Sequence, residues 1–249
     1  MRKIAFLVAN DTFPEDKSNP RLHFPKNDAQ TLAEVLKEPE SCGFEAEVYL
    51  NKTSREILRK LEKISSWKEL SQDDTLLFYY SGHGKLSGNE LCLLANDTET
   101  ESLRATSVRA SDVLGFLQQS RARRRILILD CCHSGAIVDI YKGGDADSAL
   151  DGLAHSFGTC ILSASTAIQL AEEREKDGHG VFTKALIDCL REPAKELITV
   201  DDWYDFAFRR LKFFGNQTPR IRNSREGDPI EMGDYINPSV SMFIFTRHI

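Results

Sequence analysis

Short apolar runs of strand length alternate along this chain with segments in which apolar residues recur at helical spacing. Residues 4–9 form one continuous apolar run, which is typical of a strand buried on both faces of a sheet. Comparable runs predict further strands at residues 45–50, 75–80, 125–130 and 159–164, a short strand pair at 90–95 and a last strand at 241–246.

Helical periodicity fills the intervals between these runs. One predicted helix covers residues 28–37, and the others are a helix capped by Ser54 and helices at 111–118, 181–190 and 200–213. Alternation of strands and helices predicts an α/β fold with a mostly parallel sheet covered by helices on both faces. We interpret residues 1–249 as a single domain, with flexible exposed loops at about 139–155 and 172–180.

The composition supports a packed core and narrows the range of partners. Hydrophobic residues make up 41% of the 249 residues, and the formal net charge is -6. An acidic balance argues against nucleic acid and anionic membrane as partners, and no apolar run approaches the roughly 20 residues that span a bilayer. The spacing of the six cysteines matches neither a zinc site nor a disulfide framework, so we expect reduced thiols and a cytoplasmic location.

Two of the most apolar predicted strands run directly into polar clusters. Residues 79–84 contain His83 between two glycines, and residues 129–135 contain Cys131 and Cys132. Because carboxyl ends of parallel strands meet at one edge of a sheet, neighbouring strands would bring a histidine and a cysteine together. Thiol catalysis requires that pairing, since a free thiol is mostly protonated at neutral pH and an imidazole favours the thiolate.

The motifs Tyr-Ser-Gly-His-Gly and Asp-Cys-Cys-His-Ser-Gly resemble those of caspases, metacaspases and bacterial orthocaspases. The separation of 49 residues between His83 and Cys132 matches the spacing of about 50 that is typical of caspases. The resemblance covers roughly residues 3–220 and extends to the segments 26–29, 91–97, 162–165, 180–183 and 217–219. It implies a caspase-haemoglobinase-like three-layer sandwich with about six strands, and it is closest to bacterial caspase-like domains, which often serve as effectors in stress, cell-death or anti-phage systems.

The resemblance implies a cysteine endopeptidase that acts through an acyl-enzyme. Cys132 matches the nucleophile and His83 the general acid/base, and the backbone N–H groups of Cys132 and Gly84 match the oxyanion donors. Cys131 stands where metacaspases usually have serine and is the rival nucleophile, but register with the following His-Ser-Gly favours Cys132. His133 is a rival base, although adjacent residues at a strand end point in different directions.

The same resemblance implies a basic residue at P1, the substrate position before the cleaved bond. Asp28, Ser81 and Asp130 match positions that line the S1 pocket of metacaspases. Two carboxylates in one confined pocket repel each other unless a cation joins them. We therefore expect protein substrates cleaved after arginine or lysine, with arginine preferred because its guanidinium binds carboxylates through two hydrogen bonds.

Calcium is a candidate ligand, although the resemblance requires no cofactor. Asp97, Asp112 and Asp139 match acidic positions that bind calcium in some metacaspases, and carboxylate oxygens suit that ion. Ser111 replaces one acid of that set. The three aspartates could equally be solvated loop ends or helix caps.

Two other functions fit parts of the pattern. A catalytically silent scaffold would have no need of His83, Cys132 and the acidic positions, and a disulfide oxidoreductase would use a Cys-x-x-Cys spacing rather than vicinal cysteines. We interpret the remaining cysteines as small apolar core residues and the remaining histidines, which show no partner pattern in the sequence, as structural residues: Cys42, Cys92, Cys160 and Cys189, and His23, His155, His179 and His248. We further expect a monomer that an activating protein, a small-molecule signal or self-cleavage after Lys142 or Arg174 switches on.

Overall fold

The computed structural model describes residues 1–15, 18–39, 41–88, 90–133, 159–163, 173–174, 178–191, 197–214, 220–223 and 231–234. Its main sheet has the strand order β11-β7-β6-β3-β1-β2, and in addition β4 pairs with β3 and β5 pairs with β4. The strands are β1 (Lys3–Ala9), β2 (Glu45–Leu50), β3 (Thr75–Ser87), β4 (Glu90–Leu93), β5 (Val108–Arg109), β6 (Arg124–His133), β7 (Thr159–Ser163) and β11 (Arg220–Asn223). The pairs from β2 to β7 are parallel, whereas β11 runs antiparallel to β7, as β4 does to β3.

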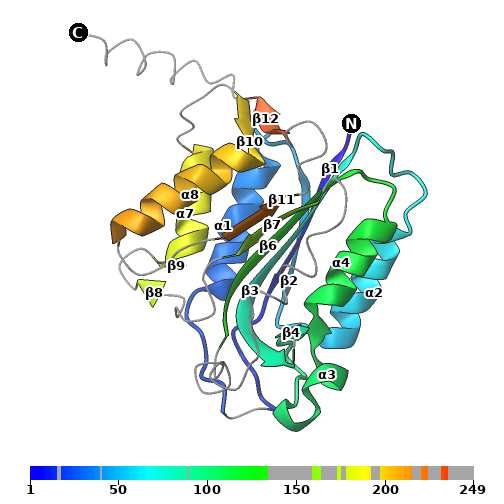
Figure 1. Ribbon diagram of the computed structural model, residues 1–249, viewed down its shortest axis with the longest axis vertical. Coiled ribbons are helices and arrows are strands. Elements are labelled where there is room, and N and C mark those ends of the chain that lie inside the picture. The colour runs from blue at the N-terminus through cyan, green and yellow to red at the C-terminus, as the bar shows by residue number, and fades with distance from the viewer. Residues whose placement is uncertain are drawn as a thin grey trace.

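Helices cover both faces of this sheet (Figure 1). One layer holds α1 (Pro25–Lys37), α7 (Val181–Arg191) and α8 (Val200–Phe214), and the other holds α2 (Ser54–Ser65) and α4 (Ala110–Gln119). Smaller elements are η1 (Thr100–Ser102), α3 (Leu103–Thr106), the pair β8 (Glu173–Arg174) and β9 (His179–Gly180), and the pair β10 (Leu197–Thr199) and β12 (Glu231–Asp234). The predicted three-layer α/β fold with a mixed, mainly parallel sheet is therefore confirmed.

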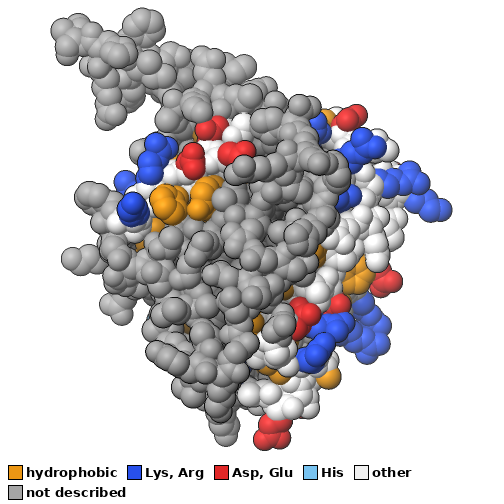
Figure 2. All heavy atoms as spheres, viewed as in Figure 1, with side chains coloured by type: hydrophobic (Ala, Val, Ile, Leu, Met, Phe, Trp, Pro, Cys, Tyr) orange, Lys and Arg blue, Asp and Glu red, His pale blue; other side chains and the backbone are white. Residues whose placement is uncertain are grey.

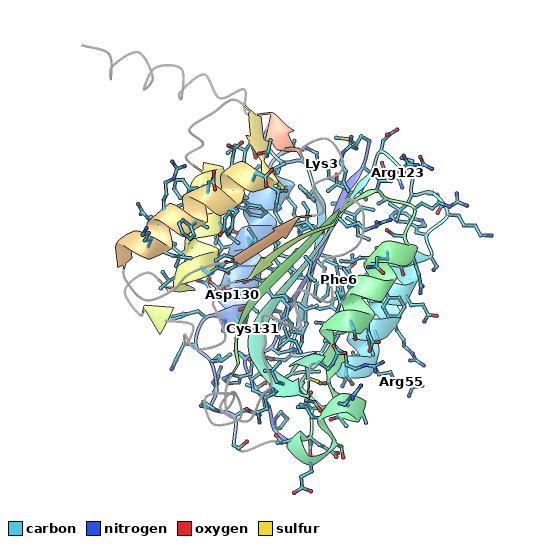
Figure 3. All side chains as sticks on the ribbon, in the orientation of Figure 1. Lys3, Phe6, Arg55, Arg123, Asp130 and Cys131 are labelled. Atoms are coloured by element: carbon cyan, nitrogen blue, oxygen red, sulfur yellow. The ribbon has the colours of Figure 1, made fainter. Side chains whose placement is uncertain are left out.

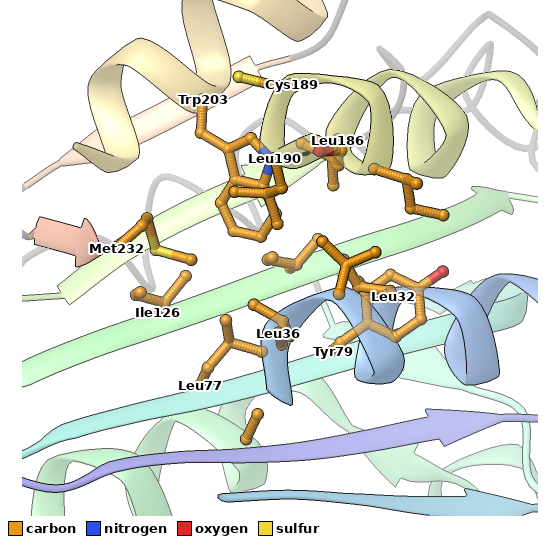
Figure 4. Close-up of a cluster of buried hydrophobic side chains, with 14 of the residues drawn as sticks. Leu32, Leu36, Leu77, Tyr79, Ile126, Leu186, Cys189, Leu190, Trp203 and Met232 are labelled. Carbon is orange, nitrogen blue, oxygen red and sulfur yellow. Dashed lines mark hydrogen bonds between the residues drawn. The ribbon is translucent and has the colours of Figure 1, made fainter. Parts of the chain in front are cut away.

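Alternation along the strands divides the interior into two cores. On β3, Leu77 and Tyr79 belong to the core under α1 and α7, whereas Phe78 and Tyr80 belong to the core under α2 and α4. Figure 4 shows the first core, where the buried indole of Trp203 donates a hydrogen bond to the carbonyl of Leu186 at 2.8 Å. Because both faces of β3 are covered, its sequence is a continuous apolar run instead of an alternating one.

The boundaries of several predicted strands and helices differ from those in the structure. The strands expected at 75–80 and 125–130 extend to Ser87 and His133, so both polar motifs lie within paired strands and not beyond them. The first helix begins at Pro25, because proline at N1 needs no hydrogen-bond partner for its nitrogen. Within the segment 172–180, the described residues Glu173–Arg174 of β8 pair with His179–Gly180 of β9. The predicted strand at 241–246 and loop at 139–155 lie outside the described residues.

The second helix begins one residue earlier than predicted, with Thr53 and not Ser54 as its N-cap. The Thr53 hydroxyl accepts from the Glu56 N–H at 3.2 Å, and the Glu56 carboxylate accepts from the Thr53 N–H at 3.0 Å. This reciprocal capping box lowers the pKa of Glu56 to about 2, mainly through the backbone N–H of Thr53. Ser54 hydrogen-bonds Asp97 instead, and that contact ties the helix start to the loop after β4.

The described surface is mainly polar. No helix within the described residues is long and apolar enough to cross a membrane. Met1 is the one large hydrophobic residue that is strongly exposed among them. Figure 2 shows lysine and arginine side chains interspersed with acidic ones on the described part of one face.

Candidate active site

The two polar motifs lie side by side because residues 75–84 of β3 pair in parallel with the whole of β6. The register places His83 opposite Cys132 and Ser81 opposite Asp130, and Gly84 follows at the end of the ladder opposite His133. A parallel ladder fixes the spacing of such pairs through backbone hydrogen bonds, so the positions do not depend on loop conformation. The structure thus brings together the histidine and cysteine positions that the sequence singles out.

Cys131 lies on the other face of the sheet from Asp130. Its side chain is 3% exposed and packs with Leu127 and Leu129 in the core under α2 and α4. Asp130, in contrast, hydrogen-bonds Thr183 of α7 on the opposite face. Figure 3 labels Asp130 and Cys131 on β6. Strand alternation assigns position 132 to the face of Asp130. Cys131 is therefore enclosed in a core, on the face away from Asp130.

The His83 ring is almost completely buried, with 3% of the residue exposed. Its Nε2 lies 2.8 Å from the carbonyl oxygen of Pro20, and the ring of Phe13 lies against it with centroids 4.9 Å apart. A carbonyl can only accept, so Nε2 carries a proton and Nδ1 is the basic nitrogen of the neutral ring. No motif in the sequence signals Pro20, because its contribution comes from the backbone.

The backbone around His83 is held as tightly as its ring. The His83 carbonyl accepts from the Leu94 N–H at 2.9 Å and from the Tyr80 hydroxyl at 2.8 Å. Asn10 supports the same place, since its side-chain amide donates to the Leu94 carbonyl at 2.9 Å. A Cβ at Gly82 would lie 2.5 Å from the Tyr80 hydroxyl oxygen and 3.0 Å from the Asn10 carbonyl oxygen. This close packing explains why a glycine precedes His83.

Substitution of Gly82 by alanine is expected to lower the free energy of unfolding by about 1–3 kcal/mol, because the new methyl group must displace Tyr80 or Asn10 in a filled core. Gly115→Ala is the matched control. Gly115 lies inside α4, and a Cβ there would have no atom within 4 Å, so alanine should stabilise the helix by about 0.5–1 kcal/mol. Urea unfolding of both variants measures the difference, and equal stabilities would contradict the close packing at Gly82.

Two buried carboxylates flank Gly180, at the start of α7. Asp28 is 2% exposed and Asp130 is 7% exposed. A Cβ at Gly180 would lie 3.1 Å from Oδ2 of Asp28 and 3.4 Å from Oδ2 of Asp130. Since Ser81 is opposite Asp130 in the ladder, all three residues predicted to line a pocket for a cation are close together.

Each carboxylate is held by a residue that precedes or begins α7. The Asp28 carboxylate accepts from the His179 Nδ1–H at 2.8 Å and from the Gly180 N–H at 3.2 Å. Oδ2 of Asp130 accepts from the Thr183 hydroxyl at 2.5 Å. The Tyr79 hydroxyl lies 2.7 Å from the Thr183 oxygen and is its donor, because the single Thr183 proton points at Asp130. Neither carboxylate therefore depends on solvent for its orientation.

The electrostatic effect of the acidic pair is visible at Tyr79. Burial raises the pKa of its hydroxyl well above the ordinary value, and the negative charges of Asp130 and Asp28 raise it further. A tyrosinate is thus strongly disfavoured there, whereas a cation that reached both carboxylates would be favoured. The arrangement is suited to binding a positively charged group.

The structure corrects the interpretation of His179 as a structural histidine without a partner. Its side chain is buried, lies in β9 and contacts the Asp28 carboxylate. The sequence does not identify Thr183, because a threonine in the first turn of a helix carries no signal for a contact with a distant strand. The Gly-His-Gly pattern at residues 178–180 is the available clue to His179.

The acidic residues considered for calcium are engaged elsewhere. Asp97 accepts from the Ser54 N–H at 2.7 Å, and Asp112 forms two hydrogen bonds of 2.7 Å with Arg109. Asp139 lies outside the described residues. Within the part of the chain that the structure describes, no group of three or more side chains is arranged to hold a metal ion. Asp97 and Asp112 therefore have protein partners in this structure, and calcium binding stays a prediction.

The cysteines interpreted as core residues are buried where they are described. Cys42 and Cys92 are almost fully enclosed, and burial raises the pKa of the Cys92 thiol. Burial also raises the pKa of Cys189 to about 12. The thiols of Cys92 and Cys189 are poor nucleophiles at neutral pH, because the reactive thiolate is hardly populated. The Cys160 side chain lies outside the described part.

Comparison with known proteins agrees with the fold and the motifs. Residues 2–228 match the family model described as the caspase domain. The fold resembles a protein from Geobacter sulfurreducens, with a TM-score of 0.66 at 16% identity over 96% of both chains. It also resembles caspase-1 from Spodoptera frugiperda, with a TM-score of 0.67 at 17% identity over 95% of this chain and 91% of that one. Comparison with curated proteins gives no match.

Proposed function

This chain belongs to the caspase domain family, and on that premise we propose that it is a cysteine endopeptidase with a Cys132–His83 dyad that cleaves after a basic residue. Membership supports a cysteine-peptidase-like hydrolase with protein substrates. The observation that carries the proposed dyad is the β3–β6 register, in which residues 83 and 132 are direct neighbours. The burial of Cys131 in the opposite core favours Cys132 over it as nucleophile.

In the proposed mechanism, His83 acts as base and then as acid. The Pro20 carbonyl keeps the proton on Nε2, so Nδ1 takes the proton of the Cys132 thiol. The thiolate attacks the scissile carbonyl carbon, and the Nδ1 proton passes to the departing amine as the C–N bond breaks. Water then attacks the thioester, His83 takes one of its protons, and the acid product leaves while Cys132 regains its thiol proton. Backbone N–H groups of Gly84 and Cys132 are the proposed donors to the oxyanion.

The proposed preference for a basic P1 residue rests on Asp28, Asp130 and Ser81. Both carboxylates are buried within a few ångströms of Gly180, where water screens their charge poorly. A guanidinium offers donors to two carboxylates at once and carries the compensating charge. Arginine should therefore be bound better than lysine, and an aspartate at P1 should be rejected by like charge.

The biological role is proposed from the family resemblance. We place the chain among regulated effectors in bacterial stress, cell death or anti-phage defence, acting as a monomer once a protein or small-molecule signal switches it on. Self-cleavage after Lys142 or Arg174 would suit the same specificity. Arg174 belongs to the short strand β8, and Lys142 lies outside the described residues.

The proposal is tested with short fluorogenic peptides that differ only at P1, with arginine, lysine, aspartate or alanine, each with and without calcium. The expected order of kcat/KM is arginine above lysine, with the aspartate peptide uncleaved. Cleavage after aspartate would overturn the acidic pocket while leaving the peptidase class intact. Absence of cleavage on every peptide would favour a catalytically silent scaffold.

A further inference from the structure

His179 makes a contact that a merely space-filling histidine does not need. Its Nδ1 lies 2.8 Å from Oδ1 of Asp28, one of the two carboxylates proposed to bind the P1 cation. The Asp28 oxygens can only accept, so Nδ1 carries the proton and donates it. His179 is 9% exposed and Asp28 is 2% exposed, so the hydrogen bond is buried. Because its acceptor is a charged carboxylate, it is stronger than a hydrogen bond between two neutral groups.

The segment that carries His179 makes a second contact with the Asp28 carboxylate. The Gly180 N–H lies 3.2 Å from each Asp28 oxygen and so donates to both. With His179 on Oδ1, these two donors fix the rotation of the carboxylate about its bond to the rest of the side chain. The plane of the Asp28 carboxylate is therefore set by residues 179 and 180 of β9.

The first turn of α1 in turn holds the β9 segment. The side-chain amide of Asn27 donates to the Gly178 carbonyl at 2.5 Å, and its nitrogen lies 3.3 Å from both ring nitrogens of His179. Gly178 has a φ of +65°, a conformation that glycine adopts without strain. Asn27, His179 and Asp28 thus form one cluster that limits the movement of the imidazole.

We propose that His179 is a positioning residue for arginine at P1, acting through Asp28. Its Nδ1–H, together with the Gly180 N–H, holds the Asp28 carboxylate in the plane that a guanidinium fork requires. A lysine ammonium is a compact charge with rotatable donors, so its binding depends much less on that plane. His179 thereby sets the preference for arginine over lysine. This inference rests on the proposed function, because it takes Asp28 as part of the S1 pocket.

The test compares His179→Leu with His179→Asn. Asparagine places an amide N–H close to where Nδ1–H stands, and leucine matches asparagine in shape but donates nothing. For His179→Leu, kcat/KM on the arginine peptide should fall about tenfold or more through KM, with kcat nearly unchanged, while the lysine peptide changes by less than about threefold. His179→Asn should restore the arginine peptide to within about threefold of the wild type.

The alternatives give different results. An equal fall for both peptides in His179→Leu, with kcat lowered, would mean that His179 only supports the fold, and the inference would be overturned. Loss of the arginine preference in His179→Asn as well would also overturn it. If His179→Leu does not fold in a thermal melt, His179→Met, which also lacks an N–H donor, replaces it, and an unchanged arginine-to-lysine ratio there would refute the inference.

A separate control distinguishes these outcomes from failure of the proposed function. The wild type is assayed with a peptide carrying citrulline, the neutral isostere of arginine, at P1. Equal cleavage of the arginine and citrulline peptides would remove the acidic pocket and the inference with it. If the wild type prefers arginine over citrulline and His179→Leu keeps that preference in full, the acidic pocket stands. Only the proposed role of His179 is then overturned.

Discussion

Replacement of Cys132 by alanine is expected to lower kcat/KM on an arginine peptide at least about a thousandfold, because loss of a covalent nucleophile costs several orders of magnitude in rate. The thiolate is the only protein group in the proposed mechanism that bonds to the substrate carbonyl carbon. Without it, the remaining groups can bind a peptide but cannot form the acyl-enzyme. Steady-state hydrolysis of the fluorogenic peptide measures the loss, and an active-site-directed peptide aldehyde that no longer forms a hemithioacetal would report the same change.

Cys131→Ala is the matched control, because it removes the adjacent thiol from the same strand. Cys131 is enclosed with Leu127 and Leu129 on the other face of β6, so its loss should leave kcat/KM within about threefold of the wild type. A small loss of stability is expected, since a buried sulfur atom is deleted. The reverse result, with Cys131→Ala inactive and Cys132→Ala active, would show that Cys131 and not Cys132 is the nucleophile.

Replacement of Asp130 by asparagine is expected to lower kcat/KM on the arginine peptide about a hundredfold, mainly through KM. Removing one partner of a buried charge pair costs roughly 2–5 kcal/mol, which corresponds to about 30-fold or more in affinity. Asparagine keeps the size of the side chain and can still accept from Thr183, so the fold should tolerate it. The measurement is the P1 panel, with thermal unfolding as the check on folding.

Asp188→Asn serves as the control for net charge. Asp188 lies on α7 and pairs with Lys184 and Arg210, so the substitution changes the charge by the same amount without reaching the acidic pair. Its kcat/KM should stay near that of the wild type. An equal loss in both variants would mean that long-range charge, and not contact with the P1 cation, accounts for the effect of Asp130→Asn.

The framework of this site can be predicted because burial on both sides leaves a strong pattern in the sequence. Residues 4–9 and 75–80 are apolar without interruption, and each forms a central strand under helices of both layers. The same reasoning places His83 and Cys132 at the carboxyl ends of neighbouring strands. Their pairing follows from the rule that parallel strands end at one edge of the sheet.

The full length of β3 and several contacts of the site could not be predicted from the sequence, for physical reasons. Polar residues such as Ser81 and His83 carry no apolar signal, so the pattern does not predict the continuation of β3 to Ser87, although the ladder to β6 and the pairing with β4 extend it. Pro20 and Gly180 act through backbone atoms, which any residue possesses. Thr183 and His179 meet acids more than 50 residues away in sequence, and only the folded chain brings them into contact.

Asp28 and Asp130 lie far in sequence from the residues that hydrogen-bond them, His179 and Thr183, and this separation has a consequence during protein synthesis. The strands that carry residues 83 and 132 leave the ribosome before Thr183, which follows about 50 residues later and so needs about 3–10 s more at ordinary elongation rates. During that interval the nascent chain contains both strands, but Asp28 and Asp130 do not yet have their hydrogen bonds from His179 and Thr183. Under the proposed function, selectivity for a basic P1 residue is therefore the last property to mature, once α7 has packed against the sheet.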